Sequence, residues 1–273
     1  MYKVNTLETC RFGLDGGAMF GVVPKTLWER AYAPSDIKNR IPMAARVLLL
    51  RGQGRVILVD TGNSPYMDEK LLNIYGIDFS EFTLEGSLNA MGVMPNDVTD
   101  VILTHLHFDH AGGAVAGQLP RFPNAVYHVQ KQHLEWARKP ELKDRASFDS
   151  TMFEPLIEHG MVNLLDGEGA VLPGVNVRLA HGHTSHMQMV LAQTEKGTVF
   201  FPADLFPTAA HLPLPYGMAY DNHPLLTIAE KRAIYTEMIE EKWVVVFEHD
   251  SLRKAGYVEN SAKGPVLGGT LDL

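Results

Sequence analysis

Four side chains of the kinds that bind metal ions lie within six residues, in the segment THLHFDH at residues 104–110. Imidazole nitrogens and carboxylate oxygens are common ligands of zinc and of related divalent ions. Side chains two residues apart in an extended loop point the same way, so His105 and His107 can share one metal ion. The turn that follows would direct Asp109 and His110 toward a second ion. The spacing therefore predicts a centre for two metal ions.

The elements that must position this cluster are strands that end in loops. A buried strand is expected at Val101 to Thr104, directly before the cluster, and two glycines after it let the chain turn sharply. Two hairpin-like blocks, Ala44 to Asp60 and Gln188 to Asp204, each finish with an aspartate at a strand end. Their similar layout indicates a pseudo-duplicated β-sandwich.

The rest of the chain alternates strand and helix signals. A strand is expected at Ala125 to Val129 and a helix from Gln130 to about Lys139. Thr227-x-x-Glu230 has the pattern of a capping box that opens a helix. An apolar run from Trp243 ends at His249, and the glycine-rich tail from Ser261 is expected to be a loop.

Composition limits the classes of function. The 273 residues fit one domain, 1–273, and the net charge of −8 argues against a nucleic-acid partner. Cys10 is the single cysteine, so metal ions must be held by histidines and carboxylates. No apolar segment has the length of a signal peptide core or a membrane span, so we expect no membrane partner and a cytoplasmic location. A small-molecule substrate is the expected partner.

The cluster His-x-His-x-Asp-His resembles the signature of the metallo-β-lactamase superfamily of hydrolases. The family's order of motifs is matched from about residue 45 to about residue 250. In this chain the motifs are, in order, Asp60, the cluster, Gly182-His183-Thr184, Asp204 and His249. The resemblance implies an α/β fold, a four-layer αβ/βα sandwich, with the site at the loop ends of two sheets.

The resemblance also implies the ligands of two divalent metal ions. The first ion would be bound by His105, His107 and His183, and the second by Asp109, His110 and His249. Asp204 would bridge the two ions, and Asp60 would orient a ligand histidine by a hydrogen bond. Zinc is the first expectation, although the same ligands accept Mn, Fe or Co.

The remaining histidines fall outside the expected ligand set. Surface or packed roles are expected for His128, His133 and His159. His181 and His186 flank His183 and could support it. The segment Ser185-His186-Met187 departs from the family, which usually continues Pro-Gly-His at this point.

One subgroup of the family is especially similar. Asp15 to Lys25, the form His-Phe-Asp-His-Ala-Gly-Gly, Ala203-Asp204-Leu205-x-Pro-Thr and Ala219-Tyr220-Asp221 resemble the quorum-quenching N-acyl-homoserine-lactone lactonases. They also resemble the methyl-parathion-hydrolase-type organophosphate hydrolases. The resemblance implies opening of a lactone ring by a metal-bridging hydroxide, and a homodimer. Phosphotriester hydrolysis, a glyoxalase II-like thiolesterase and a non-catalytic metal-binding module are the alternatives.

Catalytic residues follow from the same resemblance. Asp109 or Asp204 could relay a proton to the departing alkoxide. Related lactonases carry a tyrosine three residues after the bridging aspartate, where this chain has Pro207. Tyr220 is the candidate replacement, with Tyr216 and His211 behind it. The apolar N-terminal loop Ala18 to Val23, together with Trp28, is a candidate wall for an acyl chain.

Overall fold

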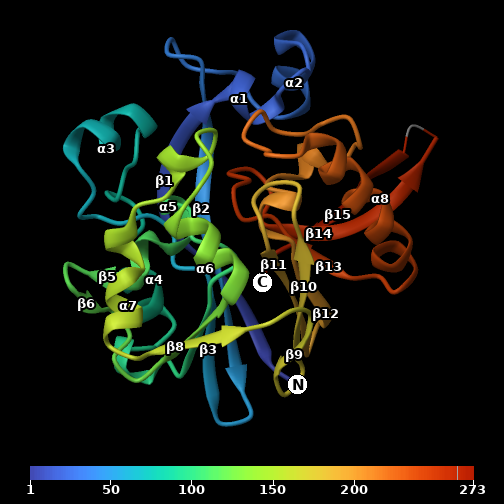
Figure 1. Cartoon of the computed structure of the whole chain (residues 1–273). Helices are drawn as coiled ribbons and strands as arrows, with labels where there is room; N and C mark the ends of the chain where they lie inside the picture. Colours follow the sequence, from blue (N-terminus) through green and yellow to red (C-terminus); the bar gives the residue numbers. More distant parts are fainter. Residues whose placement is uncertain (263) are drawn as a thin grey trace.

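Two β-sheets face each other, with helices on their outer faces, in a computed structural model that describes residues 1–262 and 264–273 (Figure 1). The first is a six-stranded sheet ordered β1-β2-β3-β4-β7-β8. Its strands are β1 (Lys3–Asp15), β2 (Arg40–Gly52), β3 (Arg55–Val59), β4 (Asp100–Ile102), β7 (Val126–Gln130) and β8 (Val162–Leu165). The second is a seven-stranded sheet ordered β15-β14-β13-β12-β11-β10-β9. Its strands are β9 (Gly169–Leu172), β10 (Val175–Ala180), β11 (Met187–Thr194), β12 (Gly197–Phe201), β13 (Val244–Val246), β14 (Ala255–Ser261) and β15 (Gly264–Leu271).

Helices and short turns connect these strands. The α-helices are α1 (Gly16–Phe20), α2 (Lys25–Ala31), α3 (Glu69–Tyr75), α4 (Leu84–Ala90), α5 (Phe108–Ala111), α6 (Lys131–Arg138), α7 (Glu154–Glu158) and α8 (Pro224–Glu240). The 3₁₀ turns are η1 (Pro95–Asp97), η2 (Gly112–Ala114), η3 (Arg145–Ser147), η4 (Ser150–Met152), η5 (Ala203–Leu205) and η6 (Ala209–His211), and β5 (Val115–Ala116) pairs with β6 (Leu119–Pro120). Across the described ranges, no helix is both long enough and apolar enough to cross a bilayer.

Strand β2 shows how the sequence builds the layers. Leu48 and Leu50 belong to the core between the two sheets, whereas Val47 and Leu49 belong to the core under α4, α6 and α7. This alternation follows from the two-residue period of a strand, and burial on both faces accounts for the apolar run at residues 47–50. Helix α8 covers the outer face of the second sheet. The expected four-layer αβ/βα sandwich is confirmed.

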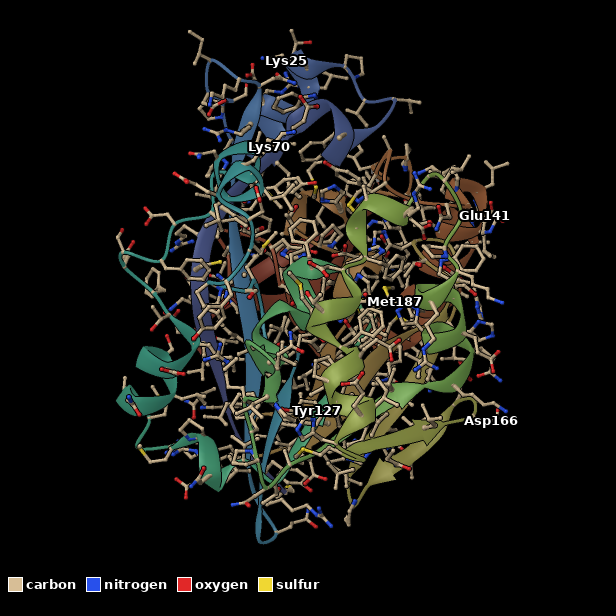
Figure 2. The ribbon with its side chains drawn as sticks, turned by 60° about the vertical axis from the view of Figure 1, so that its left-hand side comes forward. Lys25, Lys70, Tyr127, Glu141, Asp166 and Met187 are labelled. Carbon is tan, nitrogen blue, oxygen red and sulfur yellow. The ribbon has the colours of Figure 1, made fainter. Side chains whose placement is uncertain are left out.

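Parallel pairing gathers strand ends at one edge of the first sheet. Strands β3, β4, β7 and β8 run parallel to one another, so their carboxyl ends meet at one edge. The histidine-rich segment follows β4 directly. Helix α2, which carries the labelled Lys25, lies at the end of the sandwich where β1 and β2 are joined through α1 and α2 (Figure 2).

Both sequence-predicted hairpins form, as β2–β3 and β11–β12. The predicted capping box is wrong. Helix α8 begins at Pro224, because proline is favoured in the first turn, where its missing N–H is not needed. Glu230 instead accepts hydrogen bonds from the backbone N–H groups of His181 and Gly182, at 2.6 and 3.1 Å. It therefore fixes the loop that carries His183.

Two further expectations are wrong at the ends of the chain. The tail from Ser261 was expected to be a loop, but Gly264–Leu271 forms β15 against β14. Ladder hydrogen bonds come from the backbone, so glycine can occupy this edge strand, and Gly256 approaches the carbonyl oxygen of Gly269 closely enough to exclude a Cβ. The expected N-terminal loop also begins as helix, because α1 extends to Phe20 and is capped by Asp15.

Candidate metal centre

The sandwich places the expected ligands at the ends of its central strands. His105 and His107 lie in the link after β4, and the short helix α5 carries Asp109 and His110. The turn into α5 separates the pair His105 and His107 from the pair Asp109 and His110, as the sequence predicted. Three further expected ligands come from other segments of the chain. They are His183 after β10, Asp204 in η5 after β12, and His249 after β13.

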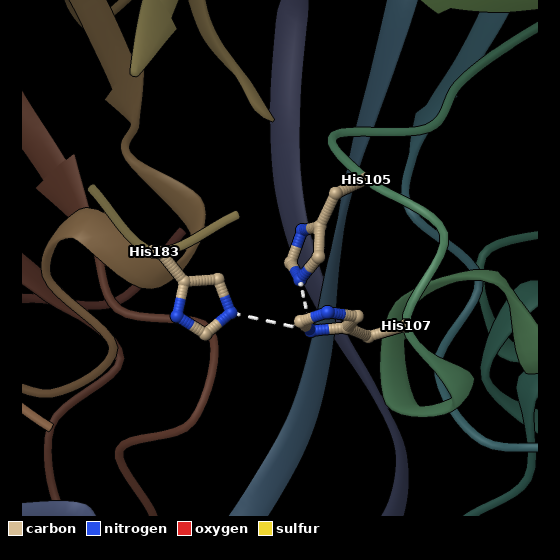
Figure 3. A group of neighbouring side chains, drawn as sticks. All are labelled: His105, His107 and His183. Atoms are coloured by element: carbon tan, nitrogen blue, oxygen red, sulfur yellow. Dashed lines mark hydrogen bonds between the residues drawn. The ribbon is translucent and has the colours of Figure 1, made fainter. Parts of the chain in front are cut away.

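One group consists of three buried histidines. Nε2 of His105 lies 3.0 Å from Nδ1 of His107, and Nε2 of His183 lies 3.2 Å from the same Nδ1 (Figure 3). Figure 3 shows His105 and His107 entering from one loop and His183 from the opposite side. The three nitrogens converge as the ligands of a single ion would.

The second group consists of Asp109, His110 and His249. The Nε2 atoms of His110 and His249 lie 3.1 Å apart. Asp109 contributes Oδ1 at 3.8 Å from His110 and Oδ2 at 3.6 Å from His249. All three side chains are buried, and they come from α5 and from the end of β13.

Asp204 lies between the two groups. Its Oδ2 is 3.2 Å from Nε2 of His183, in the first group, and its Oδ1 is 3.2 Å from Nε2 of His249, in the second. One carboxylate therefore presents one oxygen to each group. The structure thus brings together all seven residues that the sequence predicted as ligands.

The chemistry of these residues fits divalent cations. Burial, reinforced by the neighbouring histidines, holds the pKa values of His105 and His107 well below the ordinary value, so both rings are neutral. Neutral imidazole is the form that binds a metal ion. Oδ1 of Asp204 is buried and accepts no hydrogen bond from any residue in the described ranges. Converging imidazole lone pairs and a buried carboxylate are both satisfied by cations.

Asp60 orients His110, the hydrogen-bonding role the sequence predicted for it. Its Oδ2 lies 3.0 Å from Nδ1 of His110 and accepts from the hydroxyl of Thr104 at 2.6 Å, while Oδ1 accepts from the N–H of Thr104 at 2.7 Å. Asp60 has a φ of 60°, in the sparsely populated left-handed region. In this conformation its carboxylate contacts both Thr104 and His110.

Sequence reasoning missed two carboxylates that contact the ligands. Glu248 places Oε2 3.1 Å from Nδ1 of His110, and burial raises the pKa of its carboxyl to about 8. Asp221 places Oδ1 3.2 Å from Nδ1 of His183. The available signals were weak: Glu248 precedes His249, and Asp221 follows Tyr220 in a motif that had been noted for its resemblance alone.

His133 is buried and joins two loops of the site. Its Nε2 accepts from the N–H of Leu106 at 2.8 Å, and its Nδ1 donates to the carbonyl of Ser185 at 2.6 Å. Burial lowers its pKa to about 4, so the ring stays neutral at physiological pH. This packed role therefore fixes the loop between His105 and His107.

The other histidines lie away from the ligand groups. His128 contacts Asp100 at 3.0 Å, and His159 caps the carbonyl of Pro155 within its own helix. His181 and His186 pack edge to face, with ring centroids 4.5 Å apart. His186 occupies the left-handed region with a φ of 56°.

A cavity of about 60 Å³ opens onto the metal-ligand groups. It is lined by Leu14, Met19, Tyr75, His107, Phe108, Asp109, Lys143, Asp144, Ser147, His183, Asp204, Met218, Tyr220 and His249. Tyr220 therefore lines the same cavity as Asp109 and Asp204, and burial raises the pKa of its phenol. The phenol remains protonated at neutral pH and can donate a hydrogen bond.

His211 and Tyr216, the alternatives to Tyr220 as hydrogen-bond donor, do not line this cavity. Nε2 of His211 donates to the carbonyl of Met19 at 2.8 Å, and its Nδ1 accepts from Thr208 at 2.8 Å, so neither ring nitrogen is free. Tyr216 lines a different cavity. At Pro207, the carbonyl accepts the N–H of His249 at 2.9 Å, so this position supports a ligand through its backbone.

Most of the proposed N-terminal wall is core and not cavity surface. Phe20 is fully buried and stacks between Trp28 and His211, with centroid distances of 5.6 and 4.6 Å. Val22 points to solvent with 93% exposure. Phe20, Val22, Val23 and Trp28 do not line the cavity. Met19 is the residue of the proposed wall that does. Aromatic stacking in α1 and α2 fills the core here, so apolar character alone misled the prediction.

Comparison with known proteins agrees with this geometry. The family model described as "Metallo-beta-lactamase superfamily" matches residues 40–246, so the chain belongs to that superfamily. It is a metal-dependent hydrolase of the lactonase-like type, with homologues that are N-acyl homoserine lactonases. An N-acyl homoserine lactonase of a Bacillus species is 29% identical over 225 residues, covering 76% of this chain and 82% of the relative. The lactonase AiiA of Bacillus thuringiensis subsp. kurstaki is 29% identical over 219 residues, covering 74% and 79%.

Solved structures share the whole fold. A probable metal-dependent hydrolase from Staphylococcus aureus superposes with a TM-score of 0.90 at 25% identity, covering 100% of this chain and 97% of that one. AidC, a dizinc quorum-quenching lactonase solved with the product N-hexanoyl-L-homoserine, superposes with a TM-score of 0.82 at 19% identity. That match covers 100% of this chain and 95% of AidC, and it shows likeness of fold.

Proposed function

We propose that this protein binds two divalent metal ions, zinc first among them, and opens the lactone ring of N-acyl-homoserine lactones or similar lactones. The observation that carries the binuclear part is the position of Asp204. Its two oxygens lie 3.2 Å from histidines of two different groups, His183 and His249. A carboxylate placed in this way is suited to bridge two ions, and each group supplies three more protein ligands.

When bound, two such ions would supply a nucleophile from water at neutral pH and polarise the carbonyl oxygen of the substrate. The chain's own residues have separate tasks. The phenol of Tyr220 donates a hydrogen bond to the oxygen that gains negative charge. The carboxylate of Asp109 or Asp204 takes the proton that the attacking water releases and passes it to the departing alkoxide. The cavity around them holds the ring in place.

The substrate class is supported by the shape and chemistry of the cavity. Leu14, Met19, Phe108 and Met218 form apolar walls that suit an acyl chain. The relatives named N-acyl homoserine lactonase match three quarters of the chain. The metal ligands themselves do not separate lactones from phosphotriesters or thioesters, because the same chemistry serves all three. Selectivity among these substrates must therefore come from the residues that line the cavity.

One purified, metal-loaded preparation tests the proposal. Proton release reports opening of N-hexanoyl-homoserine lactone, and chromogenic assays report cleavage of a phosphotriester and a thioester. We expect kcat/KM to be highest for the lactone. A faster phosphotriester reaction would move the assignment to an organophosphate hydrolase, and a faster thioester reaction would move it to a thiolesterase.

A further inference from the structure

Tyr75 brings a second phenol to the cavity that holds the metal-ligand groups. It is the last residue of α3, is partly buried and lines that cavity together with Tyr220. Its hydroxyl forms no hydrogen bond within residues 1–262 and 264–273, and the hydroxyl oxygen is accessible to solvent. The proposed reaction uses the phenol of Tyr220 and leaves the phenol of Tyr75 without a role.

The ring of Tyr75 is held in place by apolar packing. It stacks on the ring of Phe108, with centroids 4.7 Å apart and an angle of 26° between the planes. Phe108 is the first residue of α5, the helix that carries Asp109. Tyr75 also packs against the buried cluster that Phe108 forms with Met67 and Met152. Because the ring is fixed, little conformational freedom is lost when its hydroxyl binds a ligand.

Tyr75 and Tyr220 both lie near Asp109. Burial, together with the carboxylate of Asp109, raises the pKa of the Tyr75 phenol. Burial, followed by the neighbouring Tyr75 and Asp109, raises the pKa of the Tyr220 phenol. Charged groups shift a pKa mainly at short range, so the three polar groups share one region of the cavity. Both phenols keep their protons at neutral pH and can donate hydrogen bonds there.

The two phenols come from different segments of the chain. Tyr75 ends a helix that follows β3, whereas Tyr220 precedes α8. The cavity therefore offers two separate hydrogen-bond donors of the same kind. An acylamino lactone has two carbonyl oxygens, one in the ring ester and one in the amide that carries the acyl chain. With Tyr220 serving the ester, the second donor matches the second carbonyl.

We propose that the hydroxyl of Tyr75 donates a hydrogen bond to a second carbonyl oxygen of the substrate, the amide oxygen of an acylamino lactone. This inference rests on the proposed lactonase function and assigns a residue to its selectivity. A lactone that lacks a good acceptor at this place forms one hydrogen bond fewer with the protein. The acylamino lactone is favoured by the free energy of that bond.

The variant Tyr75→Phe tests the proposal, because it removes the hydroxyl and keeps the ring that stacks on Phe108. The two substrates are N-hexanoyl-homoserine lactone and its thioamide analogue, in which sulfur, a weaker acceptor, replaces the amide oxygen. We expect the wild type to prefer the amide by about 3-fold to 10-fold in kcat/KM. The variant should lose this preference through a slower reaction of the amide alone.

The ratio between substrates separates recognition from damage to the site. A structural role for Tyr75, or a role at the reacting oxygen, lowers both reactions equally and preserves the ratio, and that result would overturn the inference. Tyr66→Phe is the matched control, because Tyr66 is 65% exposed and lines a different cavity. It should keep the wild-type rates and ratio. If the wild type opens neither lactone, the proposed function itself fails.

A binding measurement covers the case in which Tyr75→Phe does not fold. Calorimetry with the metal-loaded wild type compares the ring-opened product N-hexanoyl-homoserine with its thioamide analogue. We expect the amide product to bind about 3-fold to 10-fold more tightly. Equal dissociation constants would overturn the assignment without any variant.

Discussion

Nδ1 of His183 lies 3.2 Å from Oδ1 of Asp221, while Oδ2 of the same carboxylate accepts the N–H of Met218 at 3.2 Å. One buried side chain therefore sets the direction of a metal-facing histidine and the position of a cavity wall. Because Nδ1 is held by the carboxylate, Nε2 is the nitrogen that points toward His107 and Asp204.

Asp221→Asn should weaken the first metal group. The asparagine keeps the volume but removes the negative charge that favours the correct tautomer of His183. We expect metal affinity to fall by about 10-fold to 100-fold, measured by competition with a chromogenic chelator. Asp78→Asn, at an exposed carboxylate outside the cavity, should keep wild-type affinity. Unchanged affinity in Asp221→Asn would show that its carboxylate serves only the cavity wall.

The position of Asp204 predicts the metal content. Elemental analysis of reconstituted protein should give about two divalent ions per chain, and chelation should abolish hydrolysis. Asp204→Asn removes the bridging charge, so we expect it to retain at most one tightly bound ion and to lose most of its activity. Wild-type protein that never exceeds one ion per chain would contradict the binuclear assignment.

The metal ligands were accessible from the sequence, whereas their supports were not. Residues 105–110, in the link after β4 and in α5, hold four of the expected ligands. His183, Asp204 and His249 follow in the order of the family's motifs. Asp221 and Asp144 act through contacts with His183 and Thr184, which lie 38 and 40 residues away in the sequence, and Glu248 contacts the even more remote His110. No local pattern marks such contacts. The cytoplasmic location and the homodimer remain predictions from the sequence.

The layers could be predicted for a related reason. Strand β2 shows its burial in the apolar run at residues 47–50, and the αβ/βα sandwich follows once two such hairpins are recognised. The N-terminal wall could not be predicted, because Met19 and Phe20 are both apolar and only tertiary packing separates them. Met19 faces the cavity, and Phe20 fills the space between Trp28 and His211.

Tyr220→Phe tests the hydrogen bond to the reacting oxygen. The phenol lies in the cavity wall, and its raised pKa keeps its proton in place. We expect kcat to fall by roughly 10-fold to 1000-fold with the fold intact by circular dichroism. Tyr216→Phe is the matched control, because Tyr216 lies outside this cavity, and it should retain wild-type turnover. Equal rates for wild type and Tyr220→Phe would show that the phenol does no chemistry.

The cavity walls predict how the rate depends on acyl length. Each buried methylene contributes about 0.8 kcal/mol, part of which can appear in transition-state binding, so kcat/KM should rise along a series of homoserine lactones. Met19→Ala removes part of the apolar wall and should flatten this rise. Phe20→Ala should leave the length dependence unchanged but lower the free energy of unfolding by about 3 to 5 kcal/mol, because Phe20 is fully buried between two rings. Steady-state kinetics and denaturant titrations of both variants check these outcomes. A length dependence that Phe20→Ala flattens and Met19→Ala preserves would reverse the assignment of the two residues.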